Sequence, residues 1–296
     1  MLHSPISTAP CADPYEPYRR VGTLMAVLIF LFAIAELVAN ALHPTDRDFI
    51  SFWGAAQMAL AGIPDAAYDG AALHFEQTKA ATFSSDREMP FPYVPAFQLL
   101  VMPFGLMPFA AGMAAWVAAS FVPYFLAARR MFAQSGWLAA AFPAVLVNAA
   151  IGQNAFLTAA IFIGGLLLLG SRPFAAGLLL GCLFIKPQLG LLLPVALLAA
   201  REWRAIAGAA LSSLAVVLVG LIAFGLGTSL AWIDQAPLYV SIAREGLVGW
   251  HKLTSVYAAL RQAGLNATPA LAVHFVMAAT AAAALWQVRG SNAHTV

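Results

Sequence analysis

The 296-residue chain is 62% hydrophobic and only 9% charged, with a mean hydropathy of +0.82. Soluble domains are about half apolar and about a quarter charged, so this composition excludes an ordinary water-soluble protein and predicts an integral membrane protein. The formal net charge of +2 is too small to indicate nucleic acid or another acidic partner.

Long apolar runs predict where the chain crosses the membrane, because a spanning helix needs about 20 apolar residues and must satisfy its own backbone hydrogen bonds. Residues 1–18 are polar and predict a cytoplasmic tail, and the clearest span follows at 21–42. The stretch 93–131 is too long for one span, and its prolines predict a break with a re-entrant or interfacial part. Further apolar runs cover 137–151, 154–170, 173–200, 203–226 and 268–288. The run 173–200 is interrupted at Lys186-Pro187, which predicts two short helices meeting there.

Arginines set the sidedness of these spans. They stand at short connections or chain ends, as at Arg19-Arg20 and Arg129-Arg130, and the positive-inside rule places such connections in the cytoplasm. About eight spans follow from the run lengths, with two long acidic segments, 43–92 and 227–267, on the other side. We therefore predict a single all-α domain: a polytopic transmembrane bundle in the cell (inner) membrane, with its chemistry on the extracytoplasmic side. The alternative is that the two long segments are merely solvated loops.

The segment "DRDFISFWGAAQMALAG", residues 46–62, follows the first predicted span. Asp48 can cap a helix that starts at Phe49, and one apolar face is formed by Phe49, Phe52, Trp53, Ala56 and Leu60. Such a helix is expected in the membrane interface, with its rings among the headgroups. Asp48 would then lie between water and lipid, where it could act as a base on a hydroxyl; Asp46 is a less favoured neighbour. A plain helix cap is the alternative.

Two neutral motifs follow along the chain. In "MPFPYVP", residues 89–95, the prolines stiffen an aromatic segment, and Tyr93 suits the membrane interface. This segment could guide a lipid chain, or it could be a kinked helix start.

In "NAAIGQNAFL", residues 148–157, Gln153 and Asn154 interrupt apolar runs. Buried amides need partners, so they could bind a sugar or join helices.

Two basic side chains are candidates for phosphate binding. Lys186 lies between apolar runs, which is costly unless its ammonium faces water or an anion. It could hold a lipid phosphate and stabilise it as a leaving group, or it could reach the interface by snorkelling. His251 precedes a helical run at 256–261 and could bind a phosphate or shuttle a proton; a structural role is the alternative.

Over residues 20–262 these motifs follow one another in a definite order. They are Asp48-Phe49 with Phe52-Trp53, Ala61-Gly62, Tyr68-Asp69, Tyr93-x-Pro95, Met107-Pro108, Gly152-Gln153-Asn154, Ala176-Gly177-Leu178, Lys186-Pro187 and Arg201-Glu202-Trp203-Arg204. In this order they resemble glycosyltransferase family 87, the polytopic, mannosyltransferase-like proteins with the GT-C fold. The resemblance implies a hexosyltransferase, with mannose as the sugar, that uses a polyprenyl-phosphate donor on the extracytoplasmic side.

The resemblance also assigns expected roles. Asp48 matches the family's first-loop acid and becomes the candidate base of an inverting transfer to a glycan or lipid acceptor. The candidate substrate-binding residues are Asp46, Tyr93, Gln153, Asn154, Lys186 and His251. Neither a nucleotide cofactor nor a metal follows from a donor with a single phosphate. The family's late Pro-Tyr…Tyr-Asp segment has no counterpart before Val296, so we expect a C-terminally short member. The rival interpretations are a lipid or solute transporter and a non-catalytic, truncated membrane partner.

Overall fold

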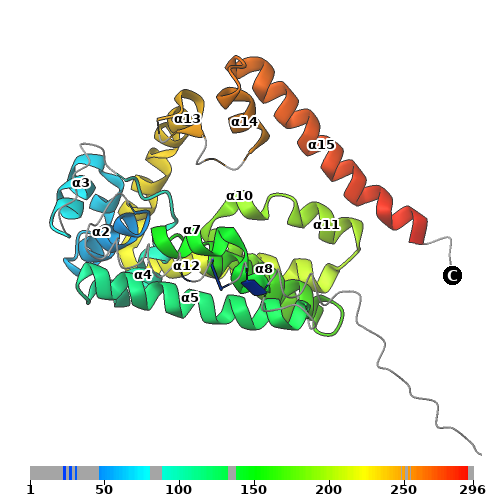
Figure 1. Cartoon of the computed structure of the whole chain (residues 1–296), viewed down its shortest axis with the longest axis horizontal. Coiled ribbons are helices and arrows are strands. Elements are labelled where there is room, and N and C mark those ends of the chain that lie inside the picture. Colours follow the sequence, from blue (N-terminus) through cyan, green and yellow to red (C-terminus); the bar gives the residue numbers. More distant parts are fainter. Residues whose placement is uncertain are drawn as a thin grey trace, which may run out of the picture.

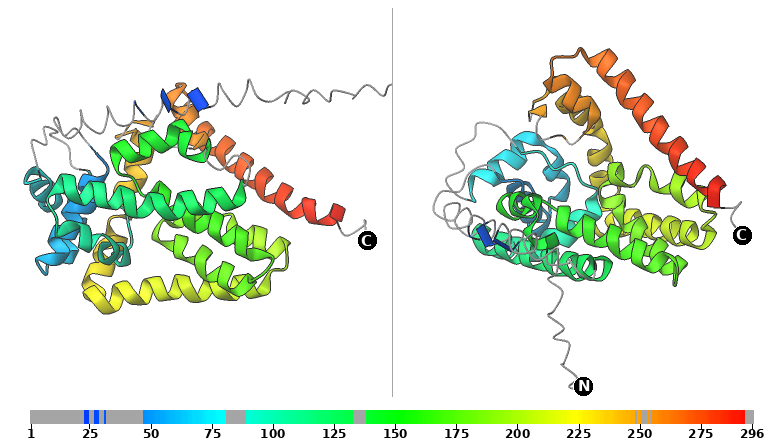
Figure 2. Two further views of the ribbon diagram at one scale, coloured as in Figure 1. Left: turned by 60° about the horizontal axis from the view of Figure 1, so that its bottom comes forward. Right: turned by 45° about the vertical axis from the view of Figure 1, so that its right-hand side comes forward.

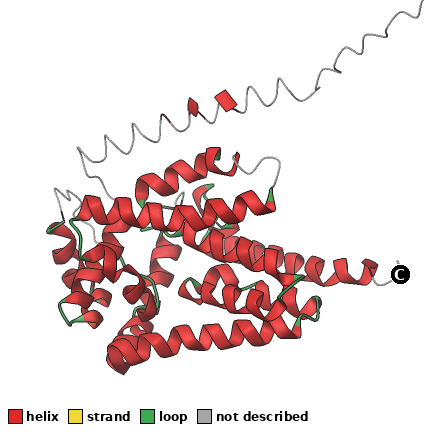
Figure 3. Ribbon diagram, turned by 90° about the horizontal axis from the view of Figure 1, so that it is seen from below, coloured by secondary structure: helices red, strands yellow, loops and turns green. Residues whose placement is uncertain are grey.

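A computed structural model describes residues 47–80, 89–132, 138–247 and 255–292, with eight isolated positions (23, 24, 27, 28, 31, 249, 250 and 253) besides. All regular elements in these residues are helical, with no strand among them, which confirms the all-α prediction (Figure 3). The predicted tail and nearly all of the predicted span at 21–42 lie outside the described residues.

Helices follow one another along the described ranges of the chain (Figure 1). They are α2 (Phe49–Leu60), η1 (Pro64–Tyr68), α3 (Gly70–Thr78), α4 (Pro95–Gly105), α5 (Phe109–Met131), α6 (Leu138–Ala141), α7 (Pro143–Ile151), α8 (Ala155–Leu169), α9 (Pro173–Gly181), η2 (Cys182–Ile185), α10 (Pro187–Gly190), α11 (Leu193–Ala199), α12 (Trp203–Asp234), α13 (Ala236–Glu245), α14 (Val256–Gln262) and α15 (Ala267–Asn292).

Three helical stretches in the described residues are long and apolar enough to cross a membrane: Phe109–Met131, Trp203–Glu245 and Ala267–Gln287. In the most apolar 18-residue segment of each stretch, only 22%, 11% and 6% is buried inside the protein. Most of this apolar surface is therefore available to lipid. The chain is therefore a multi-pass membrane protein. The remaining apolar helices are shorter than the roughly 20 residues that one span requires, and the estimate of eight spans stays a prediction.

Two of the predicted proline breaks are present, whereas Pro103 lies inside α4 without ending it. The stretch 93–131 divides into α4 and α5, because Pro108 has an extended backbone (φ −53°, ψ 146°). The run 173–200 divides at Lys186, whose backbone is also non-helical (φ −140°, ψ 74°). A proline disfavours the helical conformation for the residue before it, and Pro187 acts on Lys186 in this way. The break places a basic side chain between two short apolar helices.

Helix α12 continues past the predicted end of its run at residue 226. Gly225 leaves the helical conformation (φ 79°, ψ 176°) and kinks the helix, which then reaches Asp234 and is followed by α13. Helix α12 packs along α9 and α4, while α15 contacts α11 and α14 and otherwise stands apart from the bundle (Figure 2). Two polar residues after the kink, Gln235 and Tyr239, thereby reach the carbonyl groups of Tyr68 in η1 and Phe91 before α4.

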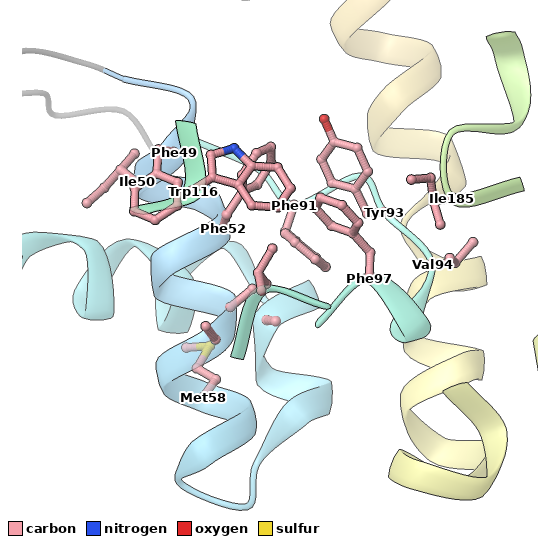
Figure 4. Packing of buried hydrophobic residues seen from close by; sticks show 14 of the residues in the cluster. Phe49, Ile50, Phe52, Met58, Phe91, Tyr93, Val94, Phe97, Trp116 and Ile185 are labelled. Atoms are coloured by element: carbon pink, nitrogen blue, oxygen red, sulfur yellow. The ribbon is translucent and has the colours of Figure 1, made fainter. Parts of the chain in front are cut away.

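An aromatic core joins α2, α4 and α5 (Figure 4). The Phe52 ring makes edge-on contacts with Tyr93, Phe97 and Trp116 at centroid distances of 5.2, 5.2 and 5.7 Å. Phe49 and Phe52 are 0% and 1% exposed, so the prediction that they lie among lipid headgroups is wrong. Because α4 and α5 cover this face of α2, its rings contact protein. The rigid core fixes the position of the residues at the start of α2.

Candidate active site

Asp48 stands at the start of α2, which begins at Phe49 as predicted. The predicted side-chain cap is absent, because the first amide groups are already bound by backbone: Ile50 donates to the Arg47 carbonyl at 3.0 Å and Ser51 to that of Asp48 at 3.1 Å. The half-buried carboxylate of Asp48 instead accepts a hydrogen bond at Oδ2 from Gln153 Nε2, at 2.5 Å. The acid is therefore directed toward the amide motif between α7 and α8.

Gln153 has both ends of its side-chain amide fixed. Its Oε1 accepts from the Tyr93 hydroxyl at 2.9 Å and from the Asn154 backbone N–H at 2.8 Å, while Nε2 donates to Asp48. This pattern sets the amide orientation, because a carboxylate needs a donor and a backbone N–H needs an acceptor. Gln153 therefore holds the carboxylate of Asp48 in one place.

Gly152 places Gln153 beside α2. It ends α7 in the left-handed conformation, with φ at 68°, and its carbonyl accepts a hydrogen bond from Trp116 Nε1 at 3.0 Å. A Cβ atom at this position would lie 2.6 Å from Cβ of Phe49, closer than real Cβ contacts. Both the backbone angle and the close approach require glycine here.

Lys186 reaches the same site from the break between η2 and α10. Its Nζ donates to Asn154 Oδ1 at 3.2 Å, lies 5.9 Å from the centre of the Tyr93 ring, and interacts electrostatically with Asp48. Asn154 is 0% exposed, and its Nδ2 has no partner among the described residues. Because the Asn154 side chain is fully buried and accepts from Lys186, we infer that it positions the ammonium group.

Tyr93 is a buried, neutral donor at the centre of these contacts. Burial, reinforced by the charge of Asp48, raises the pKa of its phenol well above the ordinary value of 10.0. The hydroxyl therefore stays protonated at physiological pH and continues to donate to Gln153. The Tyr93 carbonyl in turn accepts from the Tyr68 hydroxyl at 2.8 Å, which holds the backbone of this segment.

Two polar residues after α12 support the segment, Gln235 between α12 and α13 and Tyr239 within α13, although the sequence indicated no role for them. Gln235 donates through Nε2 to the Tyr68 carbonyl, and the Tyr239 hydroxyl donates to the Phe91 carbonyl at 3.0 Å. Tyr239 also lies within hydrogen-bonding distance of Gln235 Oε1. The available signal was their spacing of four residues, which puts both side chains on one face of a helix.

The structure thus brings together five of the residues expected at the site: Asp48, Tyr93, Gln153, Asn154 and Lys186. Asp46 and His251 lie outside the described residues, so their roles stay predictions. The helix expected after His251 is present as α14, which Ser255 caps by accepting from Ala258 N at 3.1 Å. Within the described ranges, no group of three His, Cys, Asp or Glu side chains could hold a metal ion.

Comparison with known families gives a match to glycosyltransferase family 87 over residues 91–296. The matched region includes Tyr93, Gln153, Asn154 and Lys186, whereas Asp48 precedes it. Comparisons with curated proteins and with solved structures found no match. The family match covers well over half of the chain, so the chain belongs to glycosyltransferase family 87 and is a glycosyltransferase.

Proposed function

We propose that the chain is a GT-C-type hexosyltransferase with about eight spans that moves a sugar, mannose by family resemblance, from a polyprenyl-phosphate donor to an extracytoplasmic glycan or lipid acceptor. One observation carries the proposal. A carboxylate and an ammonium approach the same Gln153-Asn154 pair, with Asp48 bound to Gln153 at 2.5 Å and Lys186 to Asn154 at 3.2 Å. The arrangement supplies a base and a phosphate-binding cation, which are the two groups that such a transfer needs.

Asp48 is the proposed general base. Gln153 binds Oδ2, and among the described residues no donor binds Oδ1, which leaves that oxygen to accept the proton of the acceptor hydroxyl. The hydroxyl oxygen then attacks the anomeric carbon while the bond from that carbon to the phosphate oxygen breaks. The bonding electron pair leaves with the polyprenyl phosphate. Attack on the face opposite the leaving group inverts the anomeric configuration.

Lys186 is the proposed partner of the leaving phosphate. The phosphate gains one negative charge as the glycosidic bond breaks, and an ammonium at this position stabilises that charge more in the transition state than in the bound donor. Asn154 holds the ammonium at 3.2 Å, so little reorganisation is needed during the reaction. The break between two short apolar helices suits a donor whose lipid chain lies in the membrane.

The first test measures the reaction class. Purified protein is given radiolabelled polyprenyl-phosphate mannose and a membrane extract as the acceptor source, and the anomeric configuration of the product is determined by NMR. We expect label transfer with inversion and release of polyprenyl phosphate. A Lys186→Met variant should lose most of this transfer, whereas Arg172→Met, at an exposed arginine before α9, should keep it. Retention of configuration, or equal activity in both variants, would contradict the proposal.

A further inference from the structure

The segment 89–93 before α4 is neither helix nor strand, and side chains from other elements hold its backbone. The Met89 carbonyl accepts from Gln77 Nε2 of α3 at 2.7 Å. The next carbonyl, that of Pro90, accepts from the Ser51 hydroxyl of α2 at 2.8 Å. Carbonyl groups shielded from water need such donors, so these side chains determine where the segment lies.

Three further side chains complete this support, and two of them come from the distant end of α12 and from α13. Tyr239 of α13 donates to the Phe91 carbonyl at 3.0 Å. Tyr68 donates to the Tyr93 carbonyl at 2.8 Å, and Gln235 in turn donates to the carbonyl of Tyr68. The bonds made by Tyr239 and Gln235 join residues 148 and 167 positions apart. The corner between α12 and α13 therefore helps to fix the backbone that carries the Tyr93 ring.

The position of Tyr93 in turn affects where the carboxylate of Asp48 lies. The Tyr93 hydroxyl donates to Gln153 Oε1 at 2.9 Å, and Gln153 Nε2 donates to Asp48 Oδ2 at 2.5 Å. Figure 4 shows the Tyr93 ring beside the rings of Phe91 and Phe97, at centroid distances of 5.4 and 4.5 Å, with its hydroxyl pointing away from them. Because the ring is packed in this way, a shift of its backbone moves the hydroxyl and the amide bound to it.

We propose that Gln235 and Tyr239 are positioning residues for the base, acting on Asp48 through the segment 89–93 and Gln153. This inference rests on the proposed function, because Asp48 is the base there. A positioning residue touches neither substrate, so its loss displaces the reacting group without weakening the binding of donor or acceptor. The expected signature is a lower kcat at unchanged KM for both substrates.

The first test compares tyrosines that make the same kind of bond in different places. Tyr239→Phe and Gln235→Met should each lower kcat by about two- to fivefold, because a hydrogen bond worth about 1 kcal/mol corresponds to about fivefold. Tyr124→Phe is the matched control, since Tyr124 of α5 also donates to a backbone carbonyl, that of Ala139, at 3.0 Å. It should lower the Tm about as much as Tyr239→Phe does and leave kcat unchanged. An equal loss of kcat in Tyr124→Phe and Tyr239→Phe, or a raised KM with unchanged kcat in Tyr239→Phe, would overturn the proposal.

The second test asks whether the effect passes through Tyr93. In a Tyr93→Phe protein the bond to Gln153 is already absent, so adding Tyr239→Phe should change kcat by less than about 1.5-fold. Independent effects would instead multiply. The same fold loss of kcat from Tyr239→Phe in both backgrounds would show that Tyr239 acts by another route and would overturn the proposal.

The third test needs no sugar transfer. The full chain is labelled with ¹⁵N-glutamine and studied by NMR in detergent, and the side-chain amide signals of Gln153 are identified by their loss in Gln153→Leu. We expect these signals to shift in Tyr239→Phe and Gln235→Met and to stay in place in Tyr124→Phe. Unmoved signals in all three variants would overturn the proposal. If the wild-type protein transfers no sugar, the proposed function fails, and this comparison still decides whether Gln235 and Tyr239 control the Gln153 amide.

Discussion

Replacing Gly152 by alanine should move Gln153 away from Asp48. The backbone at Gly152 has φ of 68°, a conformation that costs a residue with a Cβ about 1–2 kcal/mol. The added Cβ would also lie 2.6 Å from Cβ of Phe49, which is part of the rigid aromatic core. Overpacking of this kind costs about 1–3 kcal/mol, so the variant should lose about 2–5 kcal/mol of stability if the turn stays in place. Any relaxation of the turn displaces the Gln153 amide instead.

Two other glycines separate these contributions. Gly62 has φ of 79°, and an added Cβ there would meet nothing within 4 Å, so Gly62→Ala should show the backbone cost alone. Gly170 ends α8 with φ of −74° and also has open space around it, so Gly170→Ala should be nearly neutral. The predicted order of destabilisation is therefore Gly152→Ala, then Gly62→Ala, then Gly170→Ala.

The assay is the thermal midpoint in detergent together with the rate of sugar transfer. Gly152→Ala should lower both, Gly62→Ala should lower only the midpoint, and Gly170→Ala should lower neither. If Gly152→Ala keeps wild-type stability and transfer, the turn does not control the contact between Asp48 and Gln153.

Three further predictions concern side chains around the site. Tyr93→Phe removes the hydroxyl that binds Gln153 at 2.9 Å and should slow transfer about fivefold, for a hydrogen bond worth about 1 kcal/mol; an unchanged kcat would contradict this. Burial raises the pKa of Tyr93 above 10.0, so the unfolded chain releases the phenol proton at a lower pH than the folded chain does. The free energy of unfolding should therefore fall as pH rises above about 10, and it should fall less steeply in Tyr93→Phe. Tyr239→Phe leaves the Phe91 carbonyl without that donor and should cost about 1–3 kcal/mol by thermal unfolding, with no change in donor KM expected.

The broad architecture was predictable from local chemistry. Composition indicated helices in a membrane, and the prolines at 108 and 187 marked two breaks, because a proline constrains its own backbone and that of the preceding residue. Apolar periodicity identified three buried residues of α2, Phe49, Phe52 and Ala56, whereas Trp53 is half-buried and Leu60 is exposed. It could not tell burial in lipid from burial in protein, since both environments select the same side chains, and the headgroup location predicted for Phe49 and Phe52 was therefore wrong.

The sequence predicted which residues form the site, but it did not predict which hydrogen bonds join them. Tyr93, Gln153, Asn154 and Lys186 stood out as polar or basic residues within apolar runs, and the structure brings all four together. The contact between Gln153 and Asp48 joins residues 105 positions apart, which no local pattern encodes. For the same reason no sequence pattern indicated that Gln235 would bind the Tyr68 carbonyl, 167 positions away.

The central claim is that Asp48 is the base, and one substitution tests it directly. Asp48→Asn keeps the shape of the side chain and removes its capacity to take a proton, whereas Asp65→Asn makes the same change at an exposed carboxylate in η1. With labelled polyprenyl-phosphate mannose and a membrane extract, Asp48→Asn should lose transfer by at least about 100-fold, while Asp65→Asn should match the wild type. Full transfer by Asp48→Asn would contradict the account.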